Sequence, residues 1–214
     1  MICKEYSFTT GGDVGEGVLR HALIAHVVRK NRIHMLDEGA HVTLAHAIEI
    51  GGGPAFTSIR NPFSVYISCW IHRLRNRRFF GGFAEWFYTE KFVFSDYWKR
   101  FTDPGIPKEN IVRFEYIEED FASILPRIWS GTTKEEVLGF FPDAYRQWSN
   151  RLWAECIEQF MRPELYTKEM IDQVYKQDGW IFDEWGYTFE ERHIQCARGL
   201  PNSLGRGMAP PSFR

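Results

Sequence analysis

Short β-prone runs alternate with stretches of helical periodicity along this chain, and this alternation limits the folds open to it. The runs typical of strands are residues 2–9, 32–36, 55–59 and 111–114. The stretches typical of helices are residues 18–28, 41–49, 62–78, 115–129, 143–161 and 167–178. Strands that alternate with helices favour an α/β domain in which helices flank a short, mainly parallel sheet. Ligands of such sheets bind beyond the carboxyl ends of the strands.

Length and terminal composition predict the domain organisation. A chain of 214 residues suits one domain and can bury a core without disulfide or metal staples. Residues 199–214 are rich in Gly, Pro and Ser, so we expect a single domain over residues 1–198 and an extended tail after it. No run of 18 apolar residues and no apolar signal-peptide core occur, so we expect a soluble, cytoplasmic protein without a membrane span.

Charge and cysteine usage restrict the partners. The formal net charge of −2, from 26 Lys and Arg against 28 Asp and Glu, argues against a general nucleic-acid binder. The cysteines are widely spread, at Cys3, Cys69, Cys156 and Cys196, and form no Cys-x-x-Cys pair. No histidine pair has a third ligand at metal-binding spacing. We therefore expect neither nucleic acid nor a metal.

A strand-to-helix junction within residues 56–70 (FTSIRNPFSVYISCW) is the strongest site signal. Arg60 ends the strand, Asn61 suits a helix N-cap, and Pro62 suits the first helical position. Ser68 follows eight residues after Arg60, on the early turns of the helix. A guanidinium, a hydroxyl and the positive end of a helix together form an anion site. A strand-to-helix corner with a surface arginine is the alternative interpretation.

The pattern Arg-Asn-Pro-x-x-x-x-x-Ser after an apolar strand resembles the 3′-phosphate-binding segment of sulfotransferases. These enzymes use 3′-phosphoadenosine 5′-phosphosulfate (PAPS) as cosubstrate. The resemblance implies that Arg60 and Ser68 hold the 3′-phosphate of the nucleotide. It also implies a P-loop-like sulfotransferase fold.

Two later segments resemble the family in the same order. Residues 111–123 (IVRFEYIEEDFAS) resemble the strand and acidic helix start of sulfotransferases, in which Glu115 matches and Tyr116 departs from the pattern. Residues 166–187 resemble the closing helix and the Phe/Trp-Gly-Tyr signature of several branches. The resemblance covers roughly residues 10–187.

The glycine-rich segment TTGGDVGEGVLRHAL resembles the loop that cradles the 5′-phosphosulfate of PAPS, but with departures. The resemblance places around the 5′ side of the nucleotide Gly12, Asp13, Val14, Gly15, Glu16 and Gly17. Asp13 stands where the family has a Lys or Arg, and Glu16 and Gly17 replace its pair of hydroxyl residues. Two carboxylates repel a polyanion. Either another cation such as Arg20 or Lys4 therefore fills the role, or the site is degraded and the protein binds a 3′-phosphoadenosine nucleotide or anionic ligand without turnover.

Sulfuryl transfer needs a base for the attacking hydroxyl or amine, and histidine suits that role near neutral pH. The segment His41-Val-Thr-Leu resembles the His-Leu-Pro-Leu segment that carries the base of cytosolic sulfotransferases, and it lies nineteen residues before Arg60. The resemblance implies His41 as catalytic base, with His46 or Glu38 as the next candidates. The expected reaction transfers a sulfuryl group from PAPS to a small molecule or glycan. A nucleotide kinase is disfavoured because no Gly-Lys-Ser/Thr follows the glycines.

Two further segments each have two interpretations. Residues 71–78 (IHRLRNRR) carry five positive charges when His72 is protonated, which fits an anionic acceptor or a solvated helix face. Residues 79–97 hold many of the aromatic residues that make up 16% of the chain. They suit an acceptor pocket or a hydrophobic core.

Overall fold

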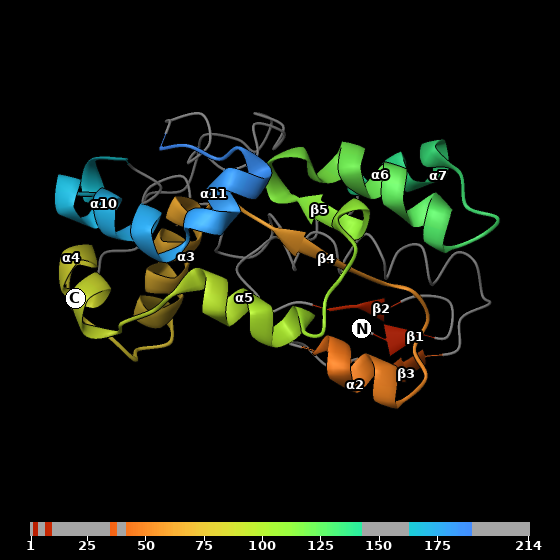
Figure 1. The fold of residues 1–214 in the computed structure, drawn as a ribbon, viewed down its shortest axis with the longest axis horizontal. Helices are drawn as coiled ribbons and strands as arrows, with labels where there is room; N and C mark the ends of the chain where they lie inside the picture. The colour runs from red at the N-terminus through yellow and green to blue at the C-terminus, as the bar shows by residue number, and fades with distance from the viewer. Residues whose placement is uncertain (1, 4–6, 10–34, 38–41, 143–162, 190–214) are drawn as a thin grey trace, which may run out of the picture.

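The computed structural model describes residues 2–3, 7–9, 35–37, 42–142 and 163–189. Its sheet contains β1 (Ile2–Cys3), β2 (Ser7–Phe8), β3 (Met35–Asp37), β4 (Ala55–Ile59) and β5 (Ile111–Arg113), in the spatial order β3-β1-β2-β4-β5. β2, β4 and β5 run parallel, whereas β1 pairs antiparallel with β2 and β3. The expected α/β class, with a short parallel sheet flanked by helices, is confirmed (Figure 1).

The prediction of one continuous strand over residues 2–9 is wrong. The structure divides this segment into β1 and β2, and Ile2 pairs with Ser7 in an antiparallel register. A short connection suffices to join antiparallel strands, and a β-prone run does not reveal such a reversal. β3 overlaps the predicted strand 32–36 in part, and the remainder of that prediction lies outside the described residues.

Four of the eight described helices overlap predicted ones, and the other four lie where the sequence predicted no helix. The described helices are α2 (Leu44–Glu49), α3 (Pro62–Arg75), α4 (Phe83–Thr89), α5 (Phe94–Thr102), α6 (Ile117–Ile128), α7 (Lys134–Leu138), α10 (Lys168–Gln177) and α11 (Gly179–Trp185). Short 3-10 turns cover Lys108–Asn110, Phe114–Tyr116 and Pro163–Leu165. The helices predicted at 18–28 and 143–161 and the tail predicted at 199–214 lie outside the described residues. Within the described part of the chain, no helix is both long and apolar enough to cross a bilayer.

Alternating side chains of β4 join two separate layers of the core. Phe56 stacks on Phe8 of β2 at 5.0 Å and lies 5.6 Å from Phe121 of α6, measured between ring centroids. Ile59 points to the other face, since residues an odd number apart on a strand face opposite ways. It belongs to the core cluster that also contains residues of α3, α4, α10 and α11. The sheet is thus covered on both faces at β4, the strand that leads into Arg60.

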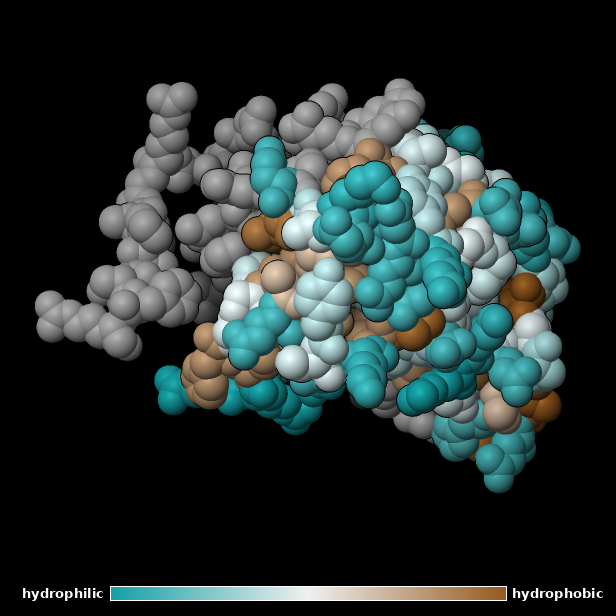
Figure 2. Space-filling model, turned by 60° about the vertical axis from the view of Figure 1, so that its left-hand side comes forward, coloured by the Kyte–Doolittle hydropathy of each residue, from teal (hydrophilic) through white to brown (hydrophobic). Residues whose placement is uncertain are grey.

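The aromatic segment 79–97 mainly builds this core. Its buried members include Phe83, Trp86, Phe87 and Phe94, which lie on α4 and α5 around α3. Phe80 and Tyr88 remain exposed. On the face drawn in Figure 2, hydrophobic residues are scattered among hydrophilic ones and form no continuous patch. The core interpretation of this segment therefore accounts for most of its aromatic side chains.

Candidate anion-binding site

α3 has a defined start, because Asn61 occupies its N-cap position and Pro62 its first turn. The Asn61 side chain accepts a hydrogen bond from the backbone N–H of Phe63 at 3.0 Å, which makes Asn61 the N-cap of α3. Pro62 follows in the first turn, where its missing N–H removes no helical bond. Arg60 therefore leaves the strand immediately before the positive end of a 14-residue helix.

Arg60 and Ser68, the two residues predicted to hold a phosphate, lie together. The Arg60 Nη1 atom is 3.5 Å from Ser68 Oγ, at the outer limit of a hydrogen bond. Both residues are buried, with 3% and 2% of their surface exposed. Ser68 follows Arg60 by eight residues in the sequence, and α3 places its hydroxyl beside the Arg60 guanidinium. This pair is the centre of the site.

An aromatic ring supports the Arg60 guanidinium from the neighbouring strand end. Arg60 Cζ lies 4.5 Å from the ring centroid of Phe114, which is 5% exposed and directly follows β5. A guanidinium stacked on a ring keeps its charge and loses rotational freedom. β4 and β5 are parallel neighbours. Arg60 and Phe114, which follow their carboxyl ends, therefore lie at the same edge of the sheet.

Glu115 joins the platform to the start of α3. Its Oε1 accepts the backbone N–H of Asn61 at 2.9 Å, and its Oε2 accepts the Tyr187 hydroxyl at 2.8 Å. The residue is only partly buried as a whole, yet burial of its carboxyl group raises the Glu115 pKa. The two hydrogen bonds and the charge of Arg60 oppose that rise, which places Arg60 within electrostatic range of this carboxylate.

The segment after α11 closes over the same junction. The Asn61 amide Nδ2 donates to the carbonyl of Thr188 at 3.0 Å, and the Phe189 ring lies 4.7 Å from the Phe63 ring. Burial, followed by the neighbouring Glu115 charge, raises the pKa of Tyr187 well above its ordinary value, so its hydroxyl stays protonated as a donor. We call Arg60, Asn61, Ser68, Phe114 and Glu115 the Arg60 corner, and residues 187–189 its strap.

The Arg60 corner unites three of the segments that the sequence analysis compared with sulfotransferases. The segments 56–70 and 111–123 meet through the contacts of Arg60 and Asn61 with Phe114 and Glu115. The segment 166–187 joins them through Tyr187, and the Tyr166 hydroxyl donates to the Phe63 carbonyl at 2.6 Å. Positions that the sequence analysis identified separately are thus one hydrogen-bonded unit.

Other predicted site residues lie outside the described part of the chain. These are His41, Glu38 and the loop residues Gly12, Asp13, Val14, Gly15, Glu16 and Gly17. His46, the second candidate for the base, lies on α2, where Nδ1 is 3.7 Å from a Glu49 carboxylate oxygen. α2 packs against α5 and is drawn well apart from α3 in Figure 1. The structure therefore does not bring His46 to the Arg60 corner.

The basic segment 71–78 straddles the far end of α3. The helix ends at Arg75, short of the predicted residue 78, and Arg77 has a left-handed φ of 52°. Arg73 forms an ion pair with Glu90 at 3.3 Å, while Arg77 and Arg78 are exposed. At a rise of 1.5 Å per residue, a helix of this length separates these charges from Arg60 by about 20 Å. They therefore do not contribute to the Arg60 corner.

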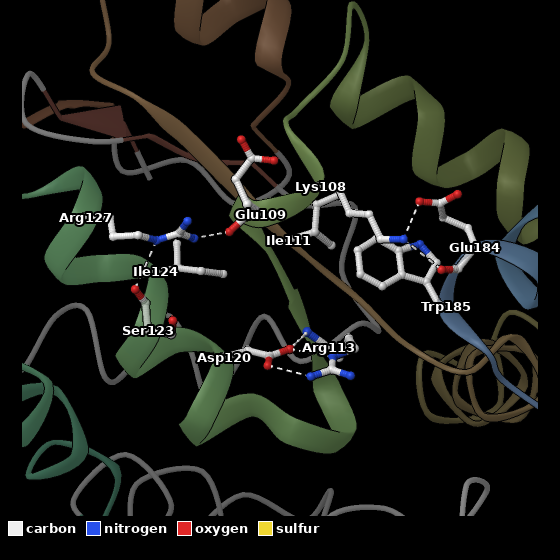
Figure 3. Close-up of a pocket in the computed structure, with 10 residues that line it drawn as sticks. All are labelled: Lys108, Glu109, Ile111, Arg113, Asp120, Ser123, Ile124, Arg127, Glu184 and Trp185. Carbon is white, nitrogen blue, oxygen red and sulfur yellow. Dashed lines mark hydrogen bonds and ion pairs between the residues drawn. The ribbon is translucent and has the colours of Figure 1, made fainter.

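A separate pocket of about 520 Å³ lies along β5, between α6 and α11 (Figure 3). Its cations already have partners in the pocket wall. Lys108 Nζ is 2.6 Å from a Glu184 carboxylate oxygen, and Arg113 Nε is 2.8 Å from Asp120 Oδ2. Arg127 donates to the carbonyls of Ser123 and Glu109. Neither Arg60 nor Ser68 lines this pocket, and its balanced charge does not favour a polyanion.

Among the described residues, no group of three or more His, Cys, Asp or Glu side chains is arranged to hold a metal ion. The expectation that no metal is needed stays a prediction. Comparisons of the chain with protein-family models, with curated proteins and with solved structures find no match. The function must therefore be argued from the site itself.

Sequence reasoning missed the roles of Phe114 and Tyr187. Both stand at positions that resemble family motifs, but no local pattern indicated that one lies beneath Arg60 or that the other bonds Glu115. The available signal was indirect. The carboxyl ends of neighbouring parallel strands lie at the same edge of a sheet. The residue that follows β5 was therefore a candidate neighbour of Arg60, which follows β4.

Proposed function

We propose that this chain is a PAPS-dependent sulfotransferase, which transfers a sulfuryl group to a hydroxyl or amine of a small molecule or glycan. One observation carries the proposal: Arg60 immediately precedes α3, and its guanidinium lies beside the Ser68 hydroxyl and is stacked on Phe114. The convergence of three family-like segments on this pair supports it further. The P-loop-like sulfotransferase fold is part of the same proposal.

The chemistry of the Arg60 corner suits the 3′-phosphate of the nucleotide. A guanidinium supplies charge and directed N–H donors, a serine hydroxyl supplies another donor, and the helix end adds positive potential. Because Arg60 is 3% exposed, a phosphate reaches the guanidinium only when groups around it move aside. The proposal therefore includes an opening step before the nucleotide is bound.

The remaining parts of the reaction are assigned from the sequence. The loop of Gly12 to Gly17 holds the 5′ side of PAPS, and His41 takes the proton from the attacking oxygen or nitrogen. The sulfuryl group passes to that atom, and adenosine 3′,5′-bisphosphate leaves. No metal takes part in this proposal.

The alternative is a protein that binds a 3′-phosphoadenosine nucleotide or a related anion without turnover. Asp13 and Glu16 favour this alternative, because they replace a cation and a hydroxyl in the loop that resembles the phosphosulfate cradle. Both alternatives require the Arg60 corner, so nucleotide binding tests what they share, and turnover separates them.

Calorimetric titration with adenosine 3′,5′-bisphosphate tests the shared requirement. We expect the wild type to bind, and Arg60→Ala to weaken the affinity by about tenfold or more, as for lost hydrogen bonds to a charged group. Arg127→Ala serves as a control at a different site, because it removes an exposed arginine from the β5 pocket. A wild type without binding, or equal losses in the two variants, contradicts the assigned site.

Turnover is then measured with radiolabelled PAPS and a panel of phenols, amines and glycans. The sulfotransferase proposal expects a labelled product, and His41→Ala should keep nucleotide binding while reducing turnover about 10²- to 10⁴-fold. Nucleotide binding without any labelled product favours the alternative. Unchanged turnover in His41→Ala rejects the base assignment alone.

A further inference from the structure

We propose that Glu115 is a positioning residue for the Arg60 corner, which aligns the Arg60 guanidinium for the 3′-phosphate without contacting the phosphate itself. The proposal rests on the proposed function, since it specifies how the assigned anion site is held in shape. It assigns a role to Glu115, which the sequence resemblance identified only as a residue that matches the family pattern.

Glu115 contacts the backbone that follows Arg60 and directly follows the residue whose ring lies against the Arg60 guanidinium. Its Oε1 holds the Asn61 N–H at 2.9 Å, and this amide is part of the peptide group that links Arg60 to Asn61. The preceding residue, Phe114, forms the aromatic platform 4.5 Å from Arg60 Cζ. One side chain therefore fixes the peptide that follows Arg60 and is covalently tied to the ring beneath it.

The strap completes this arrangement from a third part of the chain. Tyr187 donates to Glu115 Oε2 at 2.8 Å, and the next residue, Thr188, accepts from Asn61 Nδ2 at 3.0 Å. Glu115 and Asn61 are thus held by consecutive residues of the strap as well as by each other. A network closed in this way keeps few alternative geometries.

Glu115 is unsuited to contact the phosphate because a carboxylate and a phosphate carry charge of the same sign. Its two oxygens are already engaged by two donors. Its effect on an anion must therefore pass through Arg60, Asn61 and Phe114. Such a residue supports the catalytic geometry from behind the groups that touch the ligand.

A second buried carboxylate offers a matched control. Asp178 also accepts one backbone N–H near the start of a helix, from Ser95 of α5 at 2.7 Å, and one tyrosine hydroxyl, from Tyr66 at 3.0 Å. Neither of these partners belongs to the Arg60 corner. Removal of Asp178 therefore breaks the same kinds of hydrogen bond without releasing Arg60.

The test measures discrimination for the 3′-phosphate, defined as the Kd of adenosine 5′-monophosphate divided by that of adenosine 3′,5′-bisphosphate. The two probes share the adenosine and the 5′-phosphate, so partial unfolding weakens both and leaves the ratio unchanged. We expect Glu115→Ala to reduce the ratio about tenfold, as for a misplaced charged hydrogen bond. Glu115→Gln should retain it, because a glutamine can accept from Asn61 and donate to the Tyr187 oxygen. Asp178→Ala should also retain it.

Glu115→Asp guards against a failure of Glu115→Ala to fold. A side chain one methylene shorter keeps the carboxylate but cannot hold both Asn61 and Tyr187 at their present distances, so we expect a reduced ratio. A wild type that discriminates, together with unchanged discrimination in Glu115→Asp and in any folded Glu115→Ala, overturns the positioning role alone. A wild type without discrimination overturns the proposed 3′-phosphate site, and the role of Glu115 falls with it.

Discussion

Two buried carboxylates hold equivalent junctions of this protein, and they differ in what surrounds them. Glu115 binds the Asn61 N–H and the Tyr187 hydroxyl at 2.9 and 2.8 Å. Asp178 binds the Ser95 N–H and the Tyr66 hydroxyl at 2.7 and 3.0 Å. Each carboxylate therefore joins the start of a helix to a tyrosine from a distant segment. The hydrogen-bond pattern is the same in both regions.

The difference lies in the neighbouring cation. Asp178 is fully buried and stabilises α5, whose N-cap residue, Val93, has no side-chain acceptor of its own. Glu115 lies next to Phe114 and within electrostatic range of Arg60, and α3 already has its own N-cap in Asn61. The same hydrogen-bond arrangement thus stabilises the fold at Asp178 and, as we propose, supports anion recognition at Glu115.

The largest expected effect on stability is that of Asp178→Ala. The substitution leaves the Ser95 N–H and the Tyr66 hydroxyl without their acceptor in the core, so the free energy of unfolding should fall by about 2–5 kcal/mol. Urea unfolding followed by circular dichroism measures this, with Asp178→Asn as the shape-preserving control. A loss below about 1 kcal/mol would show that Asp178 is not a structural acceptor.

Glu115→Ala should lower the free energy of unfolding less than Asp178→Ala does, and it should weaken discrimination for the 3′-phosphate more. Glu115 as a whole residue is less buried than Asp178, so we expect a smaller loss, of about 1–3 kcal/mol, in the free energy of unfolding. The same urea experiment measures it beside Asp178→Ala. If Glu115→Ala destabilises the protein more than Asp178→Ala does, the division of roles between the two regions is wrong.

Removal of the tyrosine hydroxyls compares the two regions atom for atom. Tyr66→Phe and Tyr187→Phe each delete one donor to a buried carboxylate, so each should lower the free energy of unfolding by about 1 kcal/mol. In double-mutant cycles, Tyr187→Phe should couple to Glu115→Gln and be additive with Asp178→Asn. The opposite pattern of coupling would mean that the two networks are not separate.

The smallest expected effect is a change in the pH dependence of stability. Burial raises the pKa of Glu115 above 4.5 and that of Asp178 above 3.8, so the folded state holds these protons more tightly than the unfolded state. Stability from this source is present at low pH and is lost as the pH rises through the folded-state pKa values. The wild type should therefore lose stability relative to Glu115→Gln and Asp178→Asn as the pH rises from about 4 toward neutrality. Parallel curves of melting temperature against pH would exclude this contribution.

Local signals predicted the end of β4, the cap and the start of α3 around Arg60. Asn61 and Pro62 mark the start of α3 through their own backbone chemistry, and Arg60 and Ser68 are separated by less than three helical turns. The relation between these residues depends on a strand, a cap and a helix, each of which is visible in a short window of sequence. The structure has the same strand and the same helix start.

Long-range contacts could not be predicted in this way. Glu115 and Tyr187 are 72 residues apart, and Ser95 and Asp178 are 83 residues apart. No periodicity in the sequence specifies such pairs, because they depend on how helices pack against the sheet. A buried carboxylate with two donors is visible only after the chain has folded.

The aromatic segment shows a second limit of sequence reasoning. No helix was predicted at α4 or α5, because bulky aromatic side chains lose rotamer freedom in helices and weaken the local signal. Burial around α3 outweighs that weak propensity, since Trp86 and Phe94 have almost no exposed surface. Tertiary packing therefore decided the structure of this segment.

The position of a bound nucleotide tests the central claim most directly. We predict that an experimental structure with adenosine 3′,5′-bisphosphate places the 3′-phosphate oxygens within about 3 Å of Arg60 Nη1 and Ser68 Oγ. The Phe114 ring should remain beneath the guanidinium in that complex. A nucleotide seated instead in the β5 pocket of Lys108 and Arg113, with the Arg60 corner unchanged, would contradict the claim.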